Sequence, residues 1–368
     1  MKLLSFQPGS IYYNGGMGRI LRRIYIDHNC EITSLYVNNG GKIYKGEIEE
    51  IRVNVFPMQK PWMRWKLRIF FSWTRNFLFY GFTKRKLLKA AKNIEFDVLH
   101  VINHGAYSTV LCHNNFLNNK QLWSSFHDHF NTTCSSFEET KLLWCNSDRR
   151  FVISNELGFE YQRLFANKSY EIITDGLYTN ELSQPKSIKQ NELLVYFGGL
   201  LHIEYYELFM VLANALDSLV YDNFNIKLVL RGTQKLKFLC NRKFSIEYRE
   251  DFIVDAKEEL DLADIVYLPI KFNEPDFYLY SLSTKMVGYL GASGVILYHG
   301  PSDSAACNLL RKYDSAFLCN TLQLNDMIDT LNDILNNKGK QLIISKNAKE
   351  LAVREFDLKK IQNKFWKN

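Results

Sequence analysis

The hydrophobic residues of this chain alternate between short apolar runs and helical repeats. The first cycle has an apolar run at 3–6 and a glycine-rich stretch at 14–19, and apolar residues then recur at helical spacing from Met17 to Ile24. A second apolar run follows at 31–37. A strand, a helix and another strand at this spacing predict a parallel sheet.

The same cycle repeats through the rest of the chain. In the first half we expect further strands at 96–101, 122–126, 150–154 and 170–173, with a helix through Tyr161 and Phe165 after the strand at 150–154. The stretch from Gly176 to Glu192 is polar and typical of a linker. In the second half we expect strands at 193–197, 226–230, 264–269 and 316–318, a helix through 206–216, and a closing helix from 345 to 365.

Two such halves predict an α/β protein made of two doubly wound, Rossmann-like domains. We expect an N-terminal domain at 1–178, a linker at 179–192, a C-terminal domain at 193–344 and a closing C-terminal helix at 345–368. Ligands of doubly wound sheets bind beyond the carboxyl ends of the strands. We therefore expect the active site in a central cleft that the two domains face.

The composition supports a globular chain of this size. Of its 368 residues, 46% are hydrophobic and 23% are charged, which excludes a disordered protein. The formal net charge of +7 fits either simple solubility or attraction to an anionic surface, and no nucleic-acid-binding motif is present. Seven cysteines form no Cys-x-x-Cys pair, which argues against a zinc site and fits a reducing cytosol.

The N-terminus lacks the long apolar stretch of a signal peptide, because only Leu3 to Phe6 precede Gln7-Pro8-Gly9. No apolar run reaches the roughly 18 residues of a membrane-spanning helix. We therefore expect a cytoplasmic protein whose contact with a membrane, if it has one, is peripheral and at the inner face.

The most informative motif runs from Ser283 to Leu297. Ser283 or Thr284 can cap a helix, and Gly294 suits a left-handed residue that ends it. Lys285 falls in the first turn, where the helix dipole disfavours a cation. A lysine at this position is best explained by a neighbouring anion, so the motif predicts a phosphate site.

Three other segments carry candidate ligand-binding residues. The glycine loop with Gly15, Gly16 and Arg19 opens a helix, as an anion site does, but an ordinary strand–helix turn also uses glycine. Arg231 at a strand end fits either a phosphate ligand or a solvated turn. Ser302 and Ser304 precede another helix and give a further candidate anion site.

His127 and Asp128 follow a buried strand directly. They fit either a ligand-binding strand end or an ordinary surface loop. His127 and His129 are two residues apart, but no carboxylate or cysteine pattern completes a metal site. No Ser or Cys is arranged around His127, which argues against a part in nucleophilic catalysis.

The segment Ser283–Leu297 resembles the nucleotide-sugar-binding segment of GT-B glycosyltransferases, in particular the retaining glycosyltransferase family 4. The matching residues are Thr284, Lys285, Tyr289, Leu290, Ala292, Gly294, Val295 and Ile296. The glycine loop and the His-Asp pair match the same family. The resemblance implies that Gly15, Gly16 and Arg19 face the donor phosphates and the acceptor. It also implies a catalytic role for His127 and Asp128, in which His127 lies beside the transferred sugar and orients it by hydrogen bonding.

The sequence also departs from the family. Its Glu-x7-Glu motif is replaced by Tyr280 and Gly288, and the second of these glutamates would hold the donor ribose. Its Arg and Lys clamp on the donor diphosphate is replaced by Gly199 and Glu204. Glu274 and Asp276 lie close upstream and could supply the missing ribose carboxylate.

Residues 61–86 interleave aromatic residues with lysine and arginine. Such a stretch fits either a helix pair with a basic exposed face or a peripheral contact with an anionic membrane. Many relatives in family 4 act on lipid-linked sugars at the inner membrane surface, which favours the membrane contact.

The resemblance implies a glycosyltransferase that moves a sugar from a nucleotide-diphosphate sugar to a saccharide or lipid-linked acceptor in cell-surface polysaccharide synthesis, with retention. It implies no cofactor and no metal. The departures leave open a second hypothesis, a catalytically degenerate GT-B protein that acts as a scaffold or regulatory partner. A nucleotide-sugar epimerase of the same fold would need a set of carboxylates that the sequence does not provide.

Overall fold

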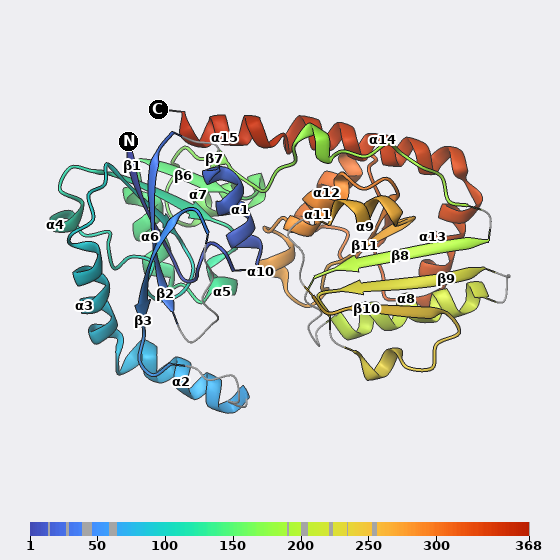
Figure 1. The fold of residues 1–368 in the computed structure, drawn as a ribbon, viewed down its shortest axis with the longest axis horizontal. Helices are drawn as coiled ribbons and strands as arrows, with labels where there is room; N and C mark the ends of the chain where they lie inside the picture. The colour runs from blue at the N-terminus through green and yellow to red at the C-terminus, as the bar shows by residue number, and fades with distance from the viewer. Residues whose placement is uncertain are drawn as a thin grey trace. The chain divides into compact units, whose positions relative to one another are not determined.

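The computed structural model describes residues 1–13, 15–26, 29–38, 46–58, 65–189, 191–199, 205–220, 224–233, 235–251 and 256–367. The chain divides into two compact units, residues 1–174 and 175–368. Each unit is built on one parallel sheet (Figure 1). The expected α/β class with two doubly wound, Rossmann-like halves is therefore confirmed.

The first unit contains a seven-stranded parallel sheet in the order β3-β2-β1-β4-β5-β6-β7. Its strands are β1 (Lys2–Gln7), β2 (Glu31–Asn38), β3 (Glu49–Asn54), β4 (Val98–Ile102), β5 (Gln121–Phe126), β6 (Arg149–Val152) and β7 (Glu171–Ile172). Its helices are α1 (Gly16–Tyr25), α2 (Trp65–Phe77), α3 (Tyr80–Ala91), α4 (Asn114–Leu117), α5 (Phe130–Thr133), α6 (Phe137–Asn146) and α7 (Asn155–Leu164). The strand order reverses between β1 and β4, which is where such sheets bind ligands.

The second unit repeats this plan with six parallel strands in the order β10-β9-β8-β11-β12-β13. Its strands are β8 (Glu192–Gly198), β9 (Asn225–Arg231), β10 (Ser245–Arg249), β11 (Ile265–Pro269), β12 (Val295–His299) and β13 (Phe317–Cys319). Its helices are α8 (Tyr206–Val220), α9 (Lys257–Leu262), α10 (Pro275–Tyr278), α11 (Thr284–Leu290), α12 (Ala305–Lys312), α13 (Leu324–Asn336), α14 (Lys338–Glu355) and α15 (Leu358–Trp366). Here the order reverses between β8 and β11.

The second sheet is apolar on both faces because helices cover both. Val195 and Phe197 of β8 pack into one core with α8 and α13, whereas Tyr196 between them packs into another with α11 and α12. This division follows from the period-2 alternation of side chains along a strand. It also explains why these strands appear in the sequence as continuous apolar runs.

Two sequence-based expectations were wrong in detail. Gly294 is not left-handed: α11 ends at Leu290, and the Gly291 cap has φ −79°. A glycine is needed at 294 because a Cβ there would lie 2.3 Å from the carbonyl oxygen of Asp264. The closing helix is two helices, α14 and α15, because the chain bends at Asp357, which forms a β-bridge with Leu177.

Candidate functional site

In the first unit, the glycine loop forms the start of α1. The helix begins at Gly16 after an extended Gly15 (φ −125°), and no side chain caps it. Its first N–H groups are therefore not satisfied by a cap, which is the usual state of an anion-binding helix start. Gly18 is fixed by packing, because a Cβ there would lie 2.5 Å from the carbonyl oxygen of Tyr13. Arg19 is half-buried one position further on.

His127 directly follows β5 and is buried, with 8% of its surface exposed. Its Nδ1 atom is buried and has no hydrogen-bond partner among the described residues. Burial, with a smaller contribution from His104, lowers the pKa of His127 to about 4. The ring is therefore neutral near pH 7 and holds an unsatisfied polar atom, which usually costs stability unless a ligand or water satisfies it.

The residues beside His127 have structural contacts. The main-chain oxygen of Asp128 accepts a hydrogen bond from Tyr161 at 3.4 Å. His129 caps α5, because its Nδ1 accepts from the main-chain N–H of Asn131 at 3.4 Å, and its ring lies against Phe130 and Tyr161. The catalytic role expected for His127 and Asp128 stays a prediction, and the structure distinguishes the two by the unpaired nitrogen of His127.

In the second unit, Lys285 lies in the first turn of α11, as the capping pattern predicts. The Ser283 side chain caps this helix by accepting from the Lys285 main-chain N–H at 3.2 Å. Lys285 Nζ lies 5.0 Å from the centre of the Phe197 ring. A Cβ at Gly199, which has φ +141°, would approach the same Nζ to 2.8 Å. The lysine is thus placed at the carboxyl end of β8.

The surroundings of Lys285 disfavour its charge. The side chain keeps partial contact with solvent, but protein atoms crowd it, and this burial lowers its pKa to about 8, with a further contribution from Lys271. No carboxylate pairs with Lys285 among the described residues. An ammonium group in this position is stabilised by an incoming anion.

Lys271 was missed by the sequence analysis. It follows β11 and is 9% exposed, and its Nζ donates to Glu274 at 3.1 Å. Glu274, proposed as a ribose carboxylate, therefore already has a lysine partner, and Asp276 lies two residues further on in α10. The signal available in the sequence was a lysine two residues after a buried strand, similar to the strand-end position that picked out Arg231.

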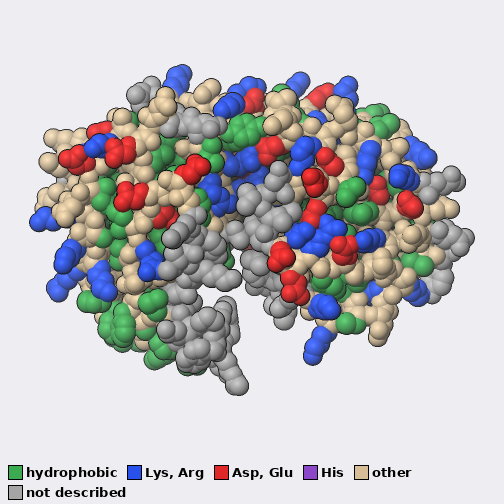
Figure 2. Space-filling model, in the orientation of Figure 1, with side chains coloured by type: hydrophobic (Ala, Val, Ile, Leu, Met, Phe, Trp, Pro, Cys, Tyr) green, Lys and Arg blue, Asp and Glu red, His purple; other side chains and the backbone are tan. Residues whose placement is uncertain are grey.

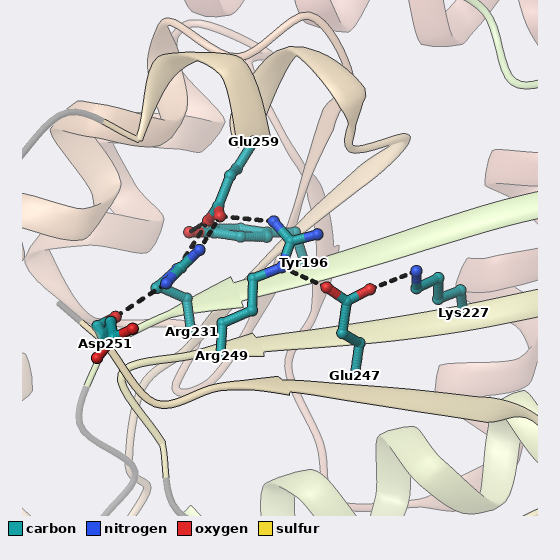
Figure 3. Close-up of polar contacts among 7 residues, drawn as sticks. All are labelled: Tyr196, Lys227, Arg231, Glu247, Arg249, Asp251 and Glu259. Atoms are coloured by element: carbon teal, nitrogen blue, oxygen red, sulfur yellow. Dashed lines mark hydrogen bonds and ion pairs between the residues drawn. The ribbon is translucent and has the colours of Figure 1, made fainter. Parts of the chain in front are cut away.

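Arg231 ends β9 and is held by a carboxylate (Figure 3). Its guanidinium forms an ion pair with Glu259 of α9 and donates to the main-chain oxygen of Asp251 at 3.0 Å. Glu259 also accepts from Arg249 and from Tyr196. Burial would raise the pKa of Glu259, but these hydrogen bonds lower it overall. The phosphate-binding role of Arg231 stays a prediction, and the structure gives the side chain another partner.

The serines of the next loop differ from each other. Ser304 is buried and caps α12, accepting from the main-chain N–H of Cys307 at 2.9 Å, and it also contacts the Tyr298 hydroxyl at 2.7 Å. Ser302 is exposed, and its carbonyl oxygen accepts from Arg311 at 3.0 Å. The Ser304 hydroxyl is therefore already used within the fold, whereas Ser302 is an exposed residue.

The structure brings together only some of the predicted donor-site residues. Ser283, Thr284 and Lys285 share the start of α11, next to Gly199. At Gly288 a Cβ would meet nothing within 4 Å, so the position of the family's ribose glutamate is open space. Glu204, the other altered clamp position, lies outside the described residues. Among the described residues, no three His, Cys, Asp or Glu side chains are grouped to hold a metal ion.

Comparisons with known proteins show the fold. No protein-family model matches the sequence, and no curated protein matches it. A sucrose-phosphate synthase structure from Thermosynechococcus elongatus matches at 12% identity with a TM-score of 0.71, over 99% of this chain and 97% of that one. HepE from Anabaena, solved with UDP and glucose, matches at 15% identity with a TM-score of 0.66, over 99% and 98%.

A third structure comes from a study of enzymatic glycosyl transfer with retention that analysed bisubstrate glycomimetics of trehalose-6-phosphate synthase. It matches at 12% identity with a TM-score of 0.65, over 99% of this chain and 98% of that one. Because these likenesses span both units, the chain has the two-domain fold of GT-B glycosyltransferases.

Proposed function

We propose that this protein is a glycosyltransferase that uses a nucleotide-diphosphate sugar as its donor. The observation that carries the proposal is Lys285, a crowded lysine without a carboxylate partner among the described residues, at the start of α11 and beside Gly199. A lysine at the carboxyl end of a parallel strand suits a diphosphate. Stabilising the diphosphate as it leaves is the main demand of glycosyl transfer.

The structural neighbours support this choice of donor. HepE was solved with UDP and glucose, and the trehalose-6-phosphate synthase structure comes from work on transfer with retention. We propose a uridine nucleotide sugar as the donor to test first, and retention of the anomeric configuration as the outcome.

The first unit would then serve the transferred sugar and the acceptor. In this proposal the neutral His127 ring forms a hydrogen bond to the sugar through its unsatisfied Nδ1, and the glycine loop at Gly15 and Gly16 accepts an anionic group. We propose a saccharide or a lipid-linked saccharide as the acceptor, in the synthesis of a cell-surface polysaccharide.

The donor is tested by titrating the purified protein with UDP, GDP and their glucose conjugates by calorimetry. Incubation with the donor that binds and with a panel of saccharide acceptors follows, with product analysis by mass spectrometry and NMR. We expect binding below millimolar concentration and an axial linkage from an α-linked donor. Absence of binding to every nucleotide diphosphate at millimolar concentration would contradict the proposal.

A second candidate function is a degenerate GT-B protein that acts as a scaffold. It is favoured by one specific observation, namely that Arg231 is engaged by Glu259 while Gly199 stands at the position of the family's arginine. Binding without turnover separates the candidates, because a scaffold would bind no donor or would bind it without any hydrolysis or transfer.

We further propose that α2 and α3 make a peripheral contact with an anionic membrane at the cytoplasmic face. Helix α2 exposes aromatic side chains and buries polar ones, which is the opposite of an ordinary surface helix. Phe70, Trp73 and Phe77 are 57%, 50% and 74% exposed, whereas Thr74 and Arg75 are buried. The exposed rings stack on one face, with Trp73 between Phe70 and Phe77. Figure 2 shows apolar side chains gathered at this end of the first unit.

The charge of this helix pair matches an anionic surface. Residues 65–92 contain eight lysines and arginines and no acidic residue. Among the described residues, none of the helices has the length and apolarity needed to cross a bilayer. An exposed aromatic stripe flanked by cations is the pattern of a helix that lies in the membrane interface. Residues 61–64 of the predicted segment lie outside the described residues.

Flotation with vesicles tests this contact. We expect the protein to float with vesicles that contain phosphatidylglycerol at low salt and to release them as salt rises. Trp73→Glu should abolish flotation. The matched control is Phe159→Glu, which places the same charge on another exposed ring, on α7. Equal flotation of the two variants, or none for the natural sequence, would contradict the contact.

A further inference from the structure

A buried chain of polar side chains crosses the first sheet from β5 to β3. It runs through Ser125, His100, Tyr25, Ser5, Gln7, Ser34 and Glu50. Apart from Glu50, which is half-buried, every member is buried. One end lies two residues before His127, and the other lies under the segment that leads into the glycine loop. No family motif and no predicted site residue includes any member of this chain.

Glu50 holds the segment before the glycine loop. Its carboxylate accepts from the Ser10 hydroxyl at 2.5 Å and from the main-chain N–H of Ile11 at 2.9 Å. The Tyr12 hydroxyl accepts from the main-chain N–H of Ile48, just before β3. Arg22 of α1 donates to the carbonyl oxygens of Ile11 and Tyr13. Residues 10–13, which lead into the glycine loop, are therefore clamped between β3 and α1.

The carboxylate also fixes the direction of every hydrogen bond in the chain. An ionised carboxylate only accepts, so the Ser34 hydroxyl donates to Glu50 at 3.1 Å and must accept from Gln7 Nε2 at 2.6 Å. The carbonyl end of the Gln7 amide then faces Ser5, whose hydroxyl donates to it at 2.8 Å. Ser5 has no second hydrogen, so the Tyr25 hydroxyl donates to Ser5 at 2.8 Å.

The remaining links follow from the single hydroxyl hydrogen of Tyr25. Because that hydrogen is given to Ser5, His100 Nδ1 must donate to the Tyr25 oxygen, at 2.6 Å. His100 Nε2 is then the acceptor for the Ser125 hydroxyl, at 2.7 Å. Burial lowers the pKa of His100 to about 3, so the ring is neutral and carries one hydrogen. The direction set at Glu50 therefore selects the Nδ1–H tautomer of His100.

We propose that Glu50 is a positioning residue that fixes two ligand-facing segments of the first unit together. It holds the segment that leads into the glycine loop through Ser10 and Ile11, and it holds the end of β5, which precedes His127, through the directed chain to Ser125. Chains of hydrogen bonds that point one way strengthen one another. The role of the two segments in binding rests on the proposed function, but the tautomer and the rigidity of the loop do not.

Three variants test the proposal, with Glu49→Ala as the matched control. Glu49 is the neighbouring acid on β3, and it is exposed. Its side chain forms no hydrogen bond or ion pair among the described residues, so its removal changes the same charge. Glu50→Ala removes the clamp and the direction of the chain. Glu50→Gln can keep one oxygen toward Ile11 and Ser34. Tyr25→Phe interrupts the chain at its centre but leaves the clamp on Ile11 intact.

Nitrogen-15 NMR of histidine-labelled protein reports the tautomer of His100, and amide hydrogen exchange reports the glycine loop. In Glu50→Ala we expect His100 to lose its preference for the Nδ1–H tautomer. We also expect amide hydrogen exchange at Ile11 and at residues 15–19 to become faster by about tenfold or more. In Tyr25→Phe, His100 should lose the tautomer preference, but the amides of the glycine loop should stay protected from exchange. Glu49→Ala should match the natural sequence. The proposal fails if Glu50→Ala resembles Glu49→Ala in both measurements.

Steady-state kinetics show whether Glu50 positions the ligand-facing segments or only stabilises the fold. Well below the unfolding midpoint of each variant, Glu50→Ala should lower kcat by roughly 10- to 100-fold with a donor KM within about threefold of the natural value. Glu50→Gln should recover most of this loss. An unchanged kcat in Glu50→Ala would overturn the positioning role. Absence of transfer by the natural sequence would instead contradict the proposed function, while the spectroscopic and exchange results still decide the role of Glu50.

Discussion

The two units place different chemistry on the same framework. Each has its candidate ligand-binding residues where parallel strands end. The glycine loop and Lys285 lie at strands where the order reverses, and His127 follows β5, the neighbour of β4. In the first unit the key group is His127, neutral and buried, with a nitrogen that lacks a partner among the described residues. In the second it is Lys285, a cation without a carboxylate beside it in the described structure.

Under the proposed function, this difference implies that the two units have different roles. A neutral imidazole can orient a sugar hydroxyl but stabilises a diphosphate poorly, whereas a lysine at a helix start does the reverse. Substitutions in the first unit should therefore change turnover, and those in the second should change donor affinity.

The largest effect is expected for His127→Ala. If the ring orients the sugar during transfer, kcat should fall roughly 100- to 1,000-fold, as for the loss of one preorganised hydrogen bond to a transition state. The dissociation constant of UDP should stay within about threefold of the natural value, since the proposed function assigns the diphosphate to Lys285. Steady-state kinetics and calorimetry measure the two quantities. His113→Ala, at an exposed histidine, is the control, and equal kcat values for both variants would contradict the role of His127.

The next effect is expected for Lys285→Ala. Loss of a charge-assisted contact to the diphosphate should raise the dissociation constant of UDP roughly 10- to 100-fold. Calorimetry at pH 7 measures it. Lys346→Ala removes an exposed lysine of α14 and should leave donor affinity unchanged. An unchanged affinity in Lys285→Ala would remove the observation on which the proposed function rests.

The pH dependence sharpens the comparison. The pKa of Lys285 is lowered to about 8, so the ligand-free protein disfavours the charged form and gains stability as pH rises from about 8 toward the usual lysine value of 10.5. An anionic donor needs the charged form. Donor affinity should therefore fall above pH 8, by up to about tenfold per pH unit. Lys285→Arg should flatten this fall, and the same slope in both proteins would assign it to another group.

The smallest effect concerns Gly288. A glycine inside α11 costs roughly 1 kcal/mol relative to alanine, and a Cβ at this position meets nothing within 4 Å. Gly288→Ala should therefore raise the free energy of unfolding by about that amount in urea denaturation, with donor affinity unchanged. A loss of donor affinity would show that a bound nucleotide fills the open space beside Gly288.

The sequence alone predicted the buried strands of both sheets and the capped start of α11. Strands such as β8 and β11 are covered on both faces, so their apolar runs are visible without any knowledge of the fold. The cap at Ser283 and the place of Lys285 depend on neighbouring residues, and local rules describe such neighbours well.

Two edge strands and the role of Gly294 were harder to predict from the sequence. β3 and β10 were missed because these edge strands are polar and only partly buried, so neither forms an apolar run. Gly294 was correctly singled out for the wrong reason, since the contact that requires a glycine comes from Asp264, thirty positions away.

The polar partners were decided only by the tertiary structure. Arg231 meets Glu259 because β9 and α9 come together, and Glu50 meets Ser10 and Ile11 because β3 pairs with β2 at one register. The sequence determined which strands and helices form, because their periods of 2 and 3.6 residues are local. It did not determine which charged side chain finds which partner, because a hydrogen bond depends on atomic positions that strand register and packing set over the whole fold.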